Sequence, residues 1–139
     1  MAGMMKGTKR LSHTLKRLPD AVEDAVKPAL NKSGDELATT MKRLAPVDEG
    51  DLRDSITVTR IGETTPPYSQ PGGSRQAKEN EVIVTAGNSR VRYAHLVEFG
   101  TSQAAAQPFF WPAYRLLKKR LKSRISRSIG KAVKEGFER

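Results

Sequence analysis

Apolar residues recur at helical spacing along residues 19–44, with gaps of three, four or seven positions between them. This stripe consists of Val22, Val26, Leu30, Leu37, Met41 and Leu44. Such spacing places side chains on one face of an α-helix. Pro19 suits the first helical turn, and Pro46 ends the helix because a proline disfavours helical geometry in the preceding residue. We expect a long helix here, kinked or broken near Pro28 and Gly34.

A second apolar stripe runs along residues 112–137, where Pro112 again suits a first helical turn. Its members are Tyr114, Leu117, Leu121, Ile125, Ile129, Val133 and Phe137. The other faces are basic, because residues 114–139 hold ten Lys or Arg and two Glu, a net charge of +8. We therefore expect a basic C-terminal helix. A solvated face and a contact surface for DNA phosphates or an acidic subunit both fit this pattern.

Two short stretches between the helices alternate apolar and polar residues, as half-buried strands do. They cover residues 55–61 and 81–86. The loop between them, residues 62–80, contains three Pro and three Gly, and a loop this long is usually functional or disordered in a small domain. We expect the strands to pair as a long-looped hairpin. Residues 90–96 fit either a third strand or a short helix.

These elements predict a single domain of the α+β class: a small, mostly antiparallel β-sheet packed by two long helices, with a long Pro/Gly-rich loop between strands. The sheet region spans residues 55–101. Residues 1–9 contain three Met and two Gly and predict a flexible tail, and residues 10–18 fit a short helix. Residues 47–52, VDEGDL, predict a turn in which Gly50 takes a positive φ.

The charge of the chain indicates which classes of partner it favours. A net charge of +10 and a pI near 10.2 favour contact with nucleic acid, anionic membranes or acidic protein surfaces. The absence of Cys excludes disulfides, thiolate nucleophiles and most structural zinc sites, and it fits a reducing cytoplasm. Apolar runs of only a few residues argue against a membrane span or a secretory signal.

Candidate catalytic and metal-binding groups are few. The two histidines, His13 and His95, are far apart, and no nucleotide-binding or hydrolase motif is present. The acidic residues at positions 48–54 lack the spacing of a calcium loop and are interpreted as a hydrated turn. Residues 72–75, GGSR, lack the strand and helix that flank a phosphate loop and are interpreted as a flexible tip. We expect no enzymatic activity, no cofactor and no metal site.

Two features near the last helix predict close packing. Glu98 lies between Val97 and Phe99, so its carboxylate is partly buried and needs an Arg or backbone N–H partner. We interpret it as a structural ion pair before the Gly100 turn rather than as a catalytic group. Residues 108–112, PFFWP, form a stiff segment because each Pro restrains the residue before it. The aromatic side chains fit either packing of the last helix onto the sheet or an anchor between subunits.

Three motifs carry a family resemblance: LAPVDEGDLRDSI at residues 44–56, YAHLVEFGT at 93–101 and PFFWPA at 108–113. Together they resemble the small neck and tail-completion proteins of long-tailed bacteriophages, a family also found in prophages and gene-transfer particles. In that family a long helix turns through the first motif into a strand, and the other two motifs lead into a C-terminal helix. The resemblance covers about residues 19–121. The long loop and the very basic last helix depart from a minimal member.

The resemblance implies a non-enzymatic virion protein of the neck or tail, assembled in the host bacterial cytoplasm. It implies a ring, expected to be a hexamer because long-tailed phage tails are sixfold, which completes or terminates the tail tube and joins it to the head. The implied partners are the tail tube protein, head-closure or connector proteins, and DNA in the lumen, with no membrane. The alternative is a small basic protein that binds nucleic acid independently of sequence.

Three sets of candidate residues follow from these patterns. For a subunit or partner interface we select Tyr68, Arg75, Phe110 and Trp111. For contact with DNA or an acidic surface we select Arg120, Lys122, Arg124 and Arg127. The structural anchors are Gly50, Tyr93, Glu98, Phe99, Gly100 and Pro108. An open edge of either predicted strand could also be completed by the next subunit.

Overall fold

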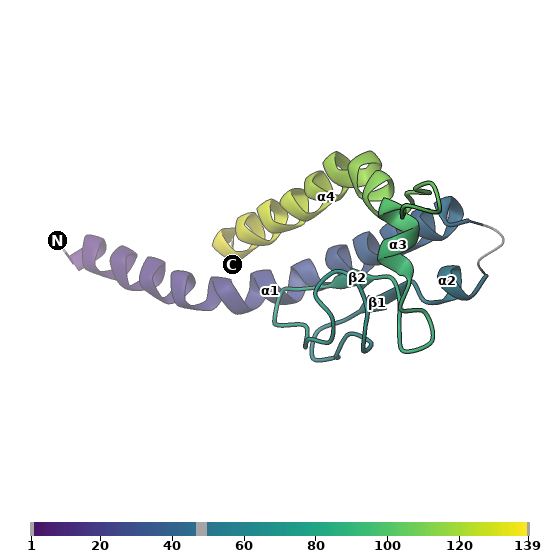
Figure 1. Ribbon diagram of the computed structural model, residues 1–139. Helices are drawn as coiled ribbons and strands as arrows, with labels where there is room; N and C mark the ends of the chain where they lie inside the picture. Colours follow the sequence, from purple (N-terminus) through teal and green to yellow (C-terminus); the bar gives the residue numbers. More distant parts are fainter. Residues whose placement is uncertain (1, 47–49, 139) are drawn as a thin grey trace.

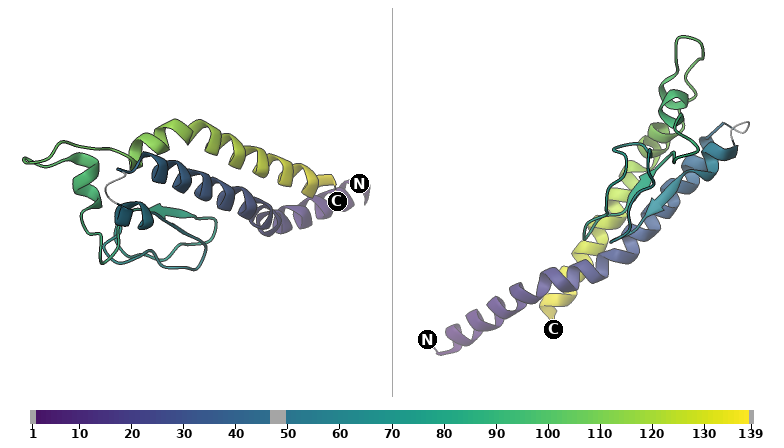
Figure 2. Two further views of the ribbon diagram at one scale, coloured as in Figure 1. Left: turned by 90° about the vertical axis from the view of Figure 1, so that its right-hand side faces the viewer. Right: turned by 60° about the horizontal axis from the view of Figure 1, so that its bottom comes forward.

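The computed structural model describes residues 2–46 and 50–138. Two long helices, α1 (Ala2–Leu44) and α4 (Phe110–Glu138), run antiparallel and side by side (Figure 1). The shorter elements gather at one end of this pair: α2 (Gly50–Asp54), β1 (Thr57–Thr59), β2 (Ile83–Thr85) and α3 (Ala94–Phe99). The N-terminal part of α1 projects past the end of α4, as both views of Figure 2 also show.

α1 is longer than the sequence pattern predicts. It begins at Ala2 and continues to Leu44, so the expected flexible tail over residues 1–9 and the separate short helix over residues 10–18 are replaced, from Ala2 onward, by helix. Pro28 lies inside α1 without breaking it. Buried residues flank this proline on both sides, and their packing offsets the backbone hydrogen bond that Pro28 cannot donate.

The two apolar stripes bring α1 and α4 together. Val26 and Met41 of α1 and Leu121 of α4 are buried, whereas the stripes become exposed toward their ends. The exposed stripe members are Leu44, Ile129 and Phe137. Ser128 of α4 also donates a hydrogen bond of 3.1 Å to a backbone carbonyl of α1. The paired helices therefore expose apolar side chains that no contact within the subunit covers.

The sheet confirms the predicted α+β class, although its strands are shorter than expected. β1 and β2 pair antiparallel with Val58 opposite Val84, and only three residues of each strand take part. The sheet lies directly on α1 at Gly34, where an added Cβ would come within 2.7 Å of Val82 and 3.1 Å of Val58. Glycine is therefore required at this position for the strands to approach the helix closely.

The loop over residues 62–80 folds back on itself. Thr65 N–H donates to the carbonyl of Arg75 at 2.8 Å, and Ala77 N–H donates to the carbonyl of Glu63 at 2.9 Å. The Thr65 hydroxyl donates to the carbonyl of Gly73 at 2.8 Å. These bonds give the segment a defined shape, including the residues interpreted from sequence as a flexible tip.

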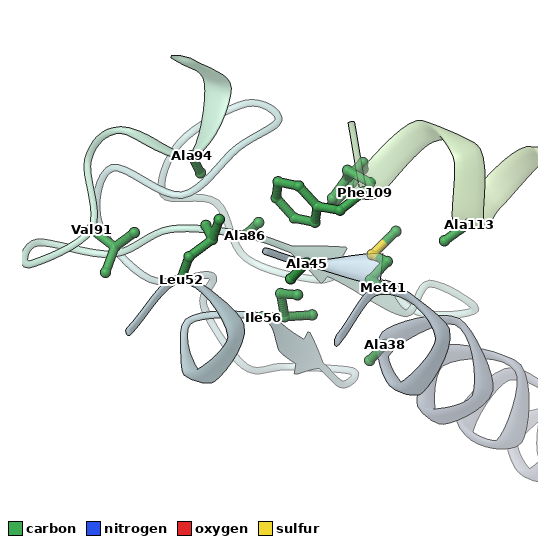
Figure 3. Packing of buried hydrophobic residues seen from close by; sticks show 11 residues of the cluster. Ala38, Met41, Ala45, Leu52, Ile56, Ala86, Val91, Ala94, Phe109 and Ala113 are labelled. Carbon is green, nitrogen blue, oxygen red and sulfur yellow. The ribbon is translucent and has the colours of Figure 1, made fainter. Parts of the chain in front are cut away.

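The main core lies where the two long helices meet the shorter elements (Figure 3). It consists of Ala38, Met41, Ala45, Leu52, Ile56, Ala86, Val91, Ala94, Phe109, Phe110 and Ala113. All three family motifs contribute to it: the first through Leu52, the second through Ala94 and the third through Phe109. Segments that are distant in sequence are thus joined by one apolar cluster.

Several element boundaries differ from the sequence expectations. Gly50 begins α2, and its φ is not positive, so the expected turn conformation is wrong at this residue. Val47, Asp48 and Glu49 lie outside the described residues. α4 begins at Phe110 rather than at Pro112, because the N–H groups of this first turn are bonded by Glu98.

Candidate functional site

Glu98 joins α3 to α4. It is 6% exposed, and its Oε2 accepts hydrogen bonds from the backbone N–H groups of Phe109 at 2.7 Å and Phe110 at 3.0 Å. Its Oε1 accepts one from Trp111 N–H at 3.0 Å. The first N–H groups of a helix have no partner within the helix, and a negative charge there is favourable. Glu98 is thus a helix cap. Of the two kinds of partner that the sequence allowed, an Arg or backbone N–H groups, the carboxylate uses the N–H groups, so the expected structural ion pair is replaced by this cap.

The chain between α3 and α4 is shaped by Gly100. Its φ of 77° is a conformation that side-chain-bearing residues rarely adopt, and an added Cβ would lie 2.7 Å from the backbone nitrogen of Ala106. The N–H of Gln107 donates to the carbonyl of Val97 at 2.8 Å, which returns the chain toward α3. Exposed Pro108 then leads into α4. Together with Glu98, these residues form a unit that we name the α3–α4 junction.

Two of the aromatic residues around this junction differ in exposure from what their suggested roles would require. Phe110, selected as an interface residue, is 8% exposed and belongs to the core, so it does not form a free surface anchor. Phe99, selected as a structural anchor, is 70% exposed. Trp111 is 38% exposed and packs edge-on against Phe110 and Tyr114, with ring centroids 5.1 and 6.1 Å away. Tyr93 lies partly buried against the core.

Phe99 and Leu96 leave an apolar patch on the outer side of α3, which we call the α3 surface. A shallow groove of about 220 Å³ adjoins it. Its lining includes Tyr93, Leu96, Val97 and Ala104. Sequence reasoning missed this patch, because the short helix over residues 94–99 could not be distinguished from a strand, and its outward face was therefore undefined.

Tyr68 and Arg75 lie on the folded loop. The guanidinium of Arg92 stacks 3.8 Å from the ring centroid of half-exposed Tyr68. Arg75 forms an ion pair with Glu81 at 3.1 Å. The pKa of Glu81 is lowered, first by the hydrogen bond from Lys78 N–H and then by Arg75, while partial burial acts in the opposite direction. Arg75 thus anchors the loop to the residues before β2, with part of its charge compensated.

The four basic candidates of α4 separate into two pairs. Arg124 is 15% exposed and donates to Oε2 of Glu36 at 2.9 Å and to the hydroxyl of Ser33 at 3.2 Å. Arg120 lies 3.1 Å from Oε1 of Glu36. These two arginines therefore tie α4 to α1. The other two candidates, Lys122 and Arg127, are exposed and have no ion pair with the described side chains of residues 20–46 and 50–137.

Glu36 is the centre of this pairing between the long helices. Its pKa is lowered mainly by the hydrogen bond from Arg124, with smaller contributions from the charges of Arg124, Arg120 and Lys32, while partial burial raises it. The carboxylate therefore stays ionised over a wider pH range than in the unfolded chain, and it stabilises the α1–α4 contact.

A second groove lies between β2 and α4 and has a volume of about 370 Å³. We call it the β2–α4 groove. Its apolar walls include Val82, Val84, Trp111, Tyr114 and Ile125. Three of the predicted interface residues, Arg75, Phe110 and Trp111, lie along it.

The described residues provide neither a metal site nor a membrane span. Among the side chains of residues 20–46 and 50–137, no group of three or more His, Asp or Glu is arranged to hold a metal ion. No helix in the same part of the chain is long and apolar enough to cross a membrane.

One comparison with known proteins gives a match. A family model described as "Bacteriophage HK97-gp10, putative tail-component" matches residues 9–100, well over half of the chain. The match spans the first two sequence motifs, the sheet and α3 up to Gly100. No curated protein and no solved structure matches the chain.

Proposed function

Because this chain belongs to the HK97-gp10-like family of bacteriophage tail components, we propose that it is a structural protein of the head–tail junction. In this proposal its subunits associate head to tail into a closed ring, a hexamer, which completes or terminates the tail tube and joins it to the head connector. A heterologous interface of this kind closes when the rotation between neighbours divides a full circle. The protein is a component of the virion and acts by assembly rather than by catalysis.

The observation that carries the ring proposal is the exposure of the α3 surface. Phe99 is 70% exposed beside exposed Leu96, on a helix whose position is fixed by the Glu98 cap. A large aromatic side chain held rigidly at the surface is characteristic of binding interfaces. The cost of leaving it in water is removed when a second subunit covers it. Tyr68, Arg75 and Trp111 remain proposed interface residues on other parts of the subunit.

The exposed cations of α4 support a further part of the proposal, the passage of DNA. Arg127, with the exposed basic residues of α4 outside the β2–α4 groove, would face the lumen and contact DNA phosphates without reading sequence. Lys122, the other unpaired candidate, lines that groove. Arg120 and Arg124 are less suited to this role, because both are engaged by Glu36. The contact is expected to weaken as the salt concentration rises.

The test of the ring proposal is the size of the assembled protein. The wild-type chain is expected to form a discrete ring, visible by electron microscopy and by light scattering after size-exclusion chromatography. Phe99→Ser should give a folded monomer with an unchanged circular dichroism spectrum. Leu116→Ser is the matched control, because Leu116 is 71% exposed on α4, away from the α3 surface, and its replacement should leave the ring intact.

Two outcomes would contradict the proposal. If the Phe99→Ser variant formed rings of normal size, the α3 surface would not be part of the subunit interface. A wild-type monomer that binds duplex DNA tightly at physiological salt would favour the alternative, a small basic protein that binds nucleic acid independently of sequence. The double substitution Arg127→Glu with Lys131→Glu, outside the β2–α4 groove, should weaken DNA binding and reduce its salt dependence whether the protein forms a ring or binds DNA as a monomer.

A further inference from the structure

The edge of β2 that borders the β2–α4 groove has unpaired backbone groups. Ala86 exchanges both of its backbone hydrogen bonds with Gln70, at 2.8 and 3.0 Å, rather than with β1. Alternate residues of a strand direct their N–H and C=O groups to opposite edges. Val84 of β2 therefore directs its groups to the same edge as Ala86, away from β1. Val82 lies one residue before β2, at the next alternate position along the chain. Within residues 2–46 and 50–138, no hydrogen bond to these outward groups is found.

The opposite wall of the groove is formed by α4. Tyr114, Leu121 and Ile125 present apolar surface toward the groove, and Trp111 also lines it. The volume of about 370 Å³ falls within the roughly 300–1,000 Å³ of protein pockets that bind ligands. An unpaired strand edge beside an apolar wall is the arrangement that binds an extended peptide as an added strand.

The charges along the groove indicate the chemistry of its occupant. Lys118 and Lys122 of α4 line the groove and have no carboxylate partner among the described residues. The other two charged residues of the lining, Arg75 and Glu81, compensate each other as an ion pair. The groove thus has a net charge of two positive units above apolar walls.

We propose that the β2–α4 groove binds an extended segment of a neighbouring protein in which apolar residues alternate with carboxylates. The segment adds a strand to the outer edge of β2 and bonds with the backbone of Val82 and Val84. Its apolar side chains pack against Tyr114 and Ile125, and its carboxylates face Lys118 and Lys122. The identity of the neighbour as a tail or neck protein rests on the proposed function, whereas the binding chemistry follows from the groove itself.

The only tryptophan of the chain lies in this groove, so intrinsic fluorescence reports on its occupancy directly. The probe is a capped ten-residue peptide of alternating valine and glutamate, used below the concentration at which it self-associates. A saturable blue shift of the Trp111 emission is expected, because the bound peptide removes water from the indole. A peptide of alternating valine and lysine is expected to bind at least tenfold more weakly.

Two charge variants distinguish peptide binding in the groove from non-specific attraction of an acidic peptide to a basic protein. Lys118→Glu with Lys122→Glu should weaken binding of the glutamate peptide at least tenfold and strengthen binding of the lysine peptide. Lys131→Glu with Lys134→Glu makes the same change of charge on α4 outside the groove, and its effect should be less than threefold. Equal weakening by both double variants would overturn the proposal.

Amide hydrogen exchange tests the added strand. The N–H of Val84 should exchange more slowly when the peptide is bound, while that of Thr85, which faces β1, should change little. Binding without protection at Val84 would overturn strand addition. An emission shift that depends on protein concentration, and that the peptide cannot displace, would assign the groove to a second copy of this chain. An equal shift with duplex DNA would assign it to nucleic acid.

The outcomes for the groove and for the ring are distinguishable. Peptide binding by a chain that never forms rings would support the groove and contradict the ring. Rings that form normally, combined with no peptide binding at any concentration, would contradict the groove alone.

Discussion

The α3–α4 junction and the β2–α4 groove both include residues from the first turns of α4. They differ in whether their polar and charged groups have hydrogen-bond or ion-pair partners. At the junction, buried Glu98 accepts three backbone hydrogen bonds and the chain returns to α3 within a few residues. Along the groove, the outward backbone groups of β2 and the ammonium groups of Lys118 and Lys122 have no partner among the described residues. The groups of the junction are thus paired within one subunit, whereas these groups of the groove are not.

This difference shows that the surroundings of a residue, rather than its type, decide whether it is buried in the core or exposed to a partner. Phe110 and Trp111 are adjacent in sequence and both line the groove, yet Phe110 is 8% exposed within the core whereas Trp111 is 38% exposed. Substitutions at the junction should therefore affect the free energy of unfolding, whereas substitutions along the groove should mainly affect binding.

The largest expected effect is that of Glu98→Ala. It leaves three N–H groups at the start of α4 without their acceptor, and each unsatisfied buried group costs about 1–3 kcal/mol. We expect a loss of about 3–5 kcal/mol in the free energy of unfolding, measured by urea denaturation followed by circular dichroism. Glu79→Ala is the control, because Glu79 is exposed and its replacement should change stability by about 0.5 kcal/mol or less. A loss below about 1 kcal/mol for Glu98→Ala would contradict the cap.

The next effect is that of Gly100→Ala, which disturbs the same junction through the backbone. The φ of 77° is strained for alanine, and its Cβ would lie 2.7 Å from the Ala106 nitrogen. We expect a loss of about 1–3 kcal/mol in thermal or urea unfolding. Gly130→Ala is the matched control within α4, where an added Cβ meets nothing within 4 Å, and it should instead raise stability by up to about 1 kcal/mol. Equal effects at both glycines would show that local geometry is not the cause.

The smallest effect is that of Glu36→Gln, which weakens the contact between the helices that form part of the groove wall. We expect a loss of about 1 kcal/mol at neutral pH, because the ion pairs with Arg120 and Arg124 are partly exposed. The folded-state pKa of Glu36 lies below its ordinary value of 4.5, so its contribution is present above pH 4.5 and is lost as the pH falls through the folded-state pKa. The stabilities of wild type and variant should therefore converge in acid. A difference that stays constant between pH 7 and pH 3 would exclude Glu36 as the group responsible.

Much of the fold could be predicted from the pattern of the sequence. The apolar stripes of α1 and α4 and the alternation around β1 and β2 identify four of the elements, because side chains that are buried at regular intervals are apolar at regular intervals in the sequence. The motifs around Glu98 and Gly100 indicated a buried carboxylate and a turn before the last helix. The local signal failed at the start of α1, because Pro19 fits a first turn but lies inside a longer helix, whereas Pro112 does lie in the first turn of α4.

The candidate site was predicted less well, because side-chain exposure depends on contacts between distant segments. The sequence by itself determined the helical stripes, the α+β class and the basic character of α4, since each depends on residue type and spacing along the chain. Only the tertiary structure decided that Phe99 faces solvent while Phe110 is buried, that Arg124 pairs with Glu36, and that an open strand edge borders α4. These outcomes depend on which surfaces the folded chain leaves uncovered, and that is set by packing rather than by periodicity.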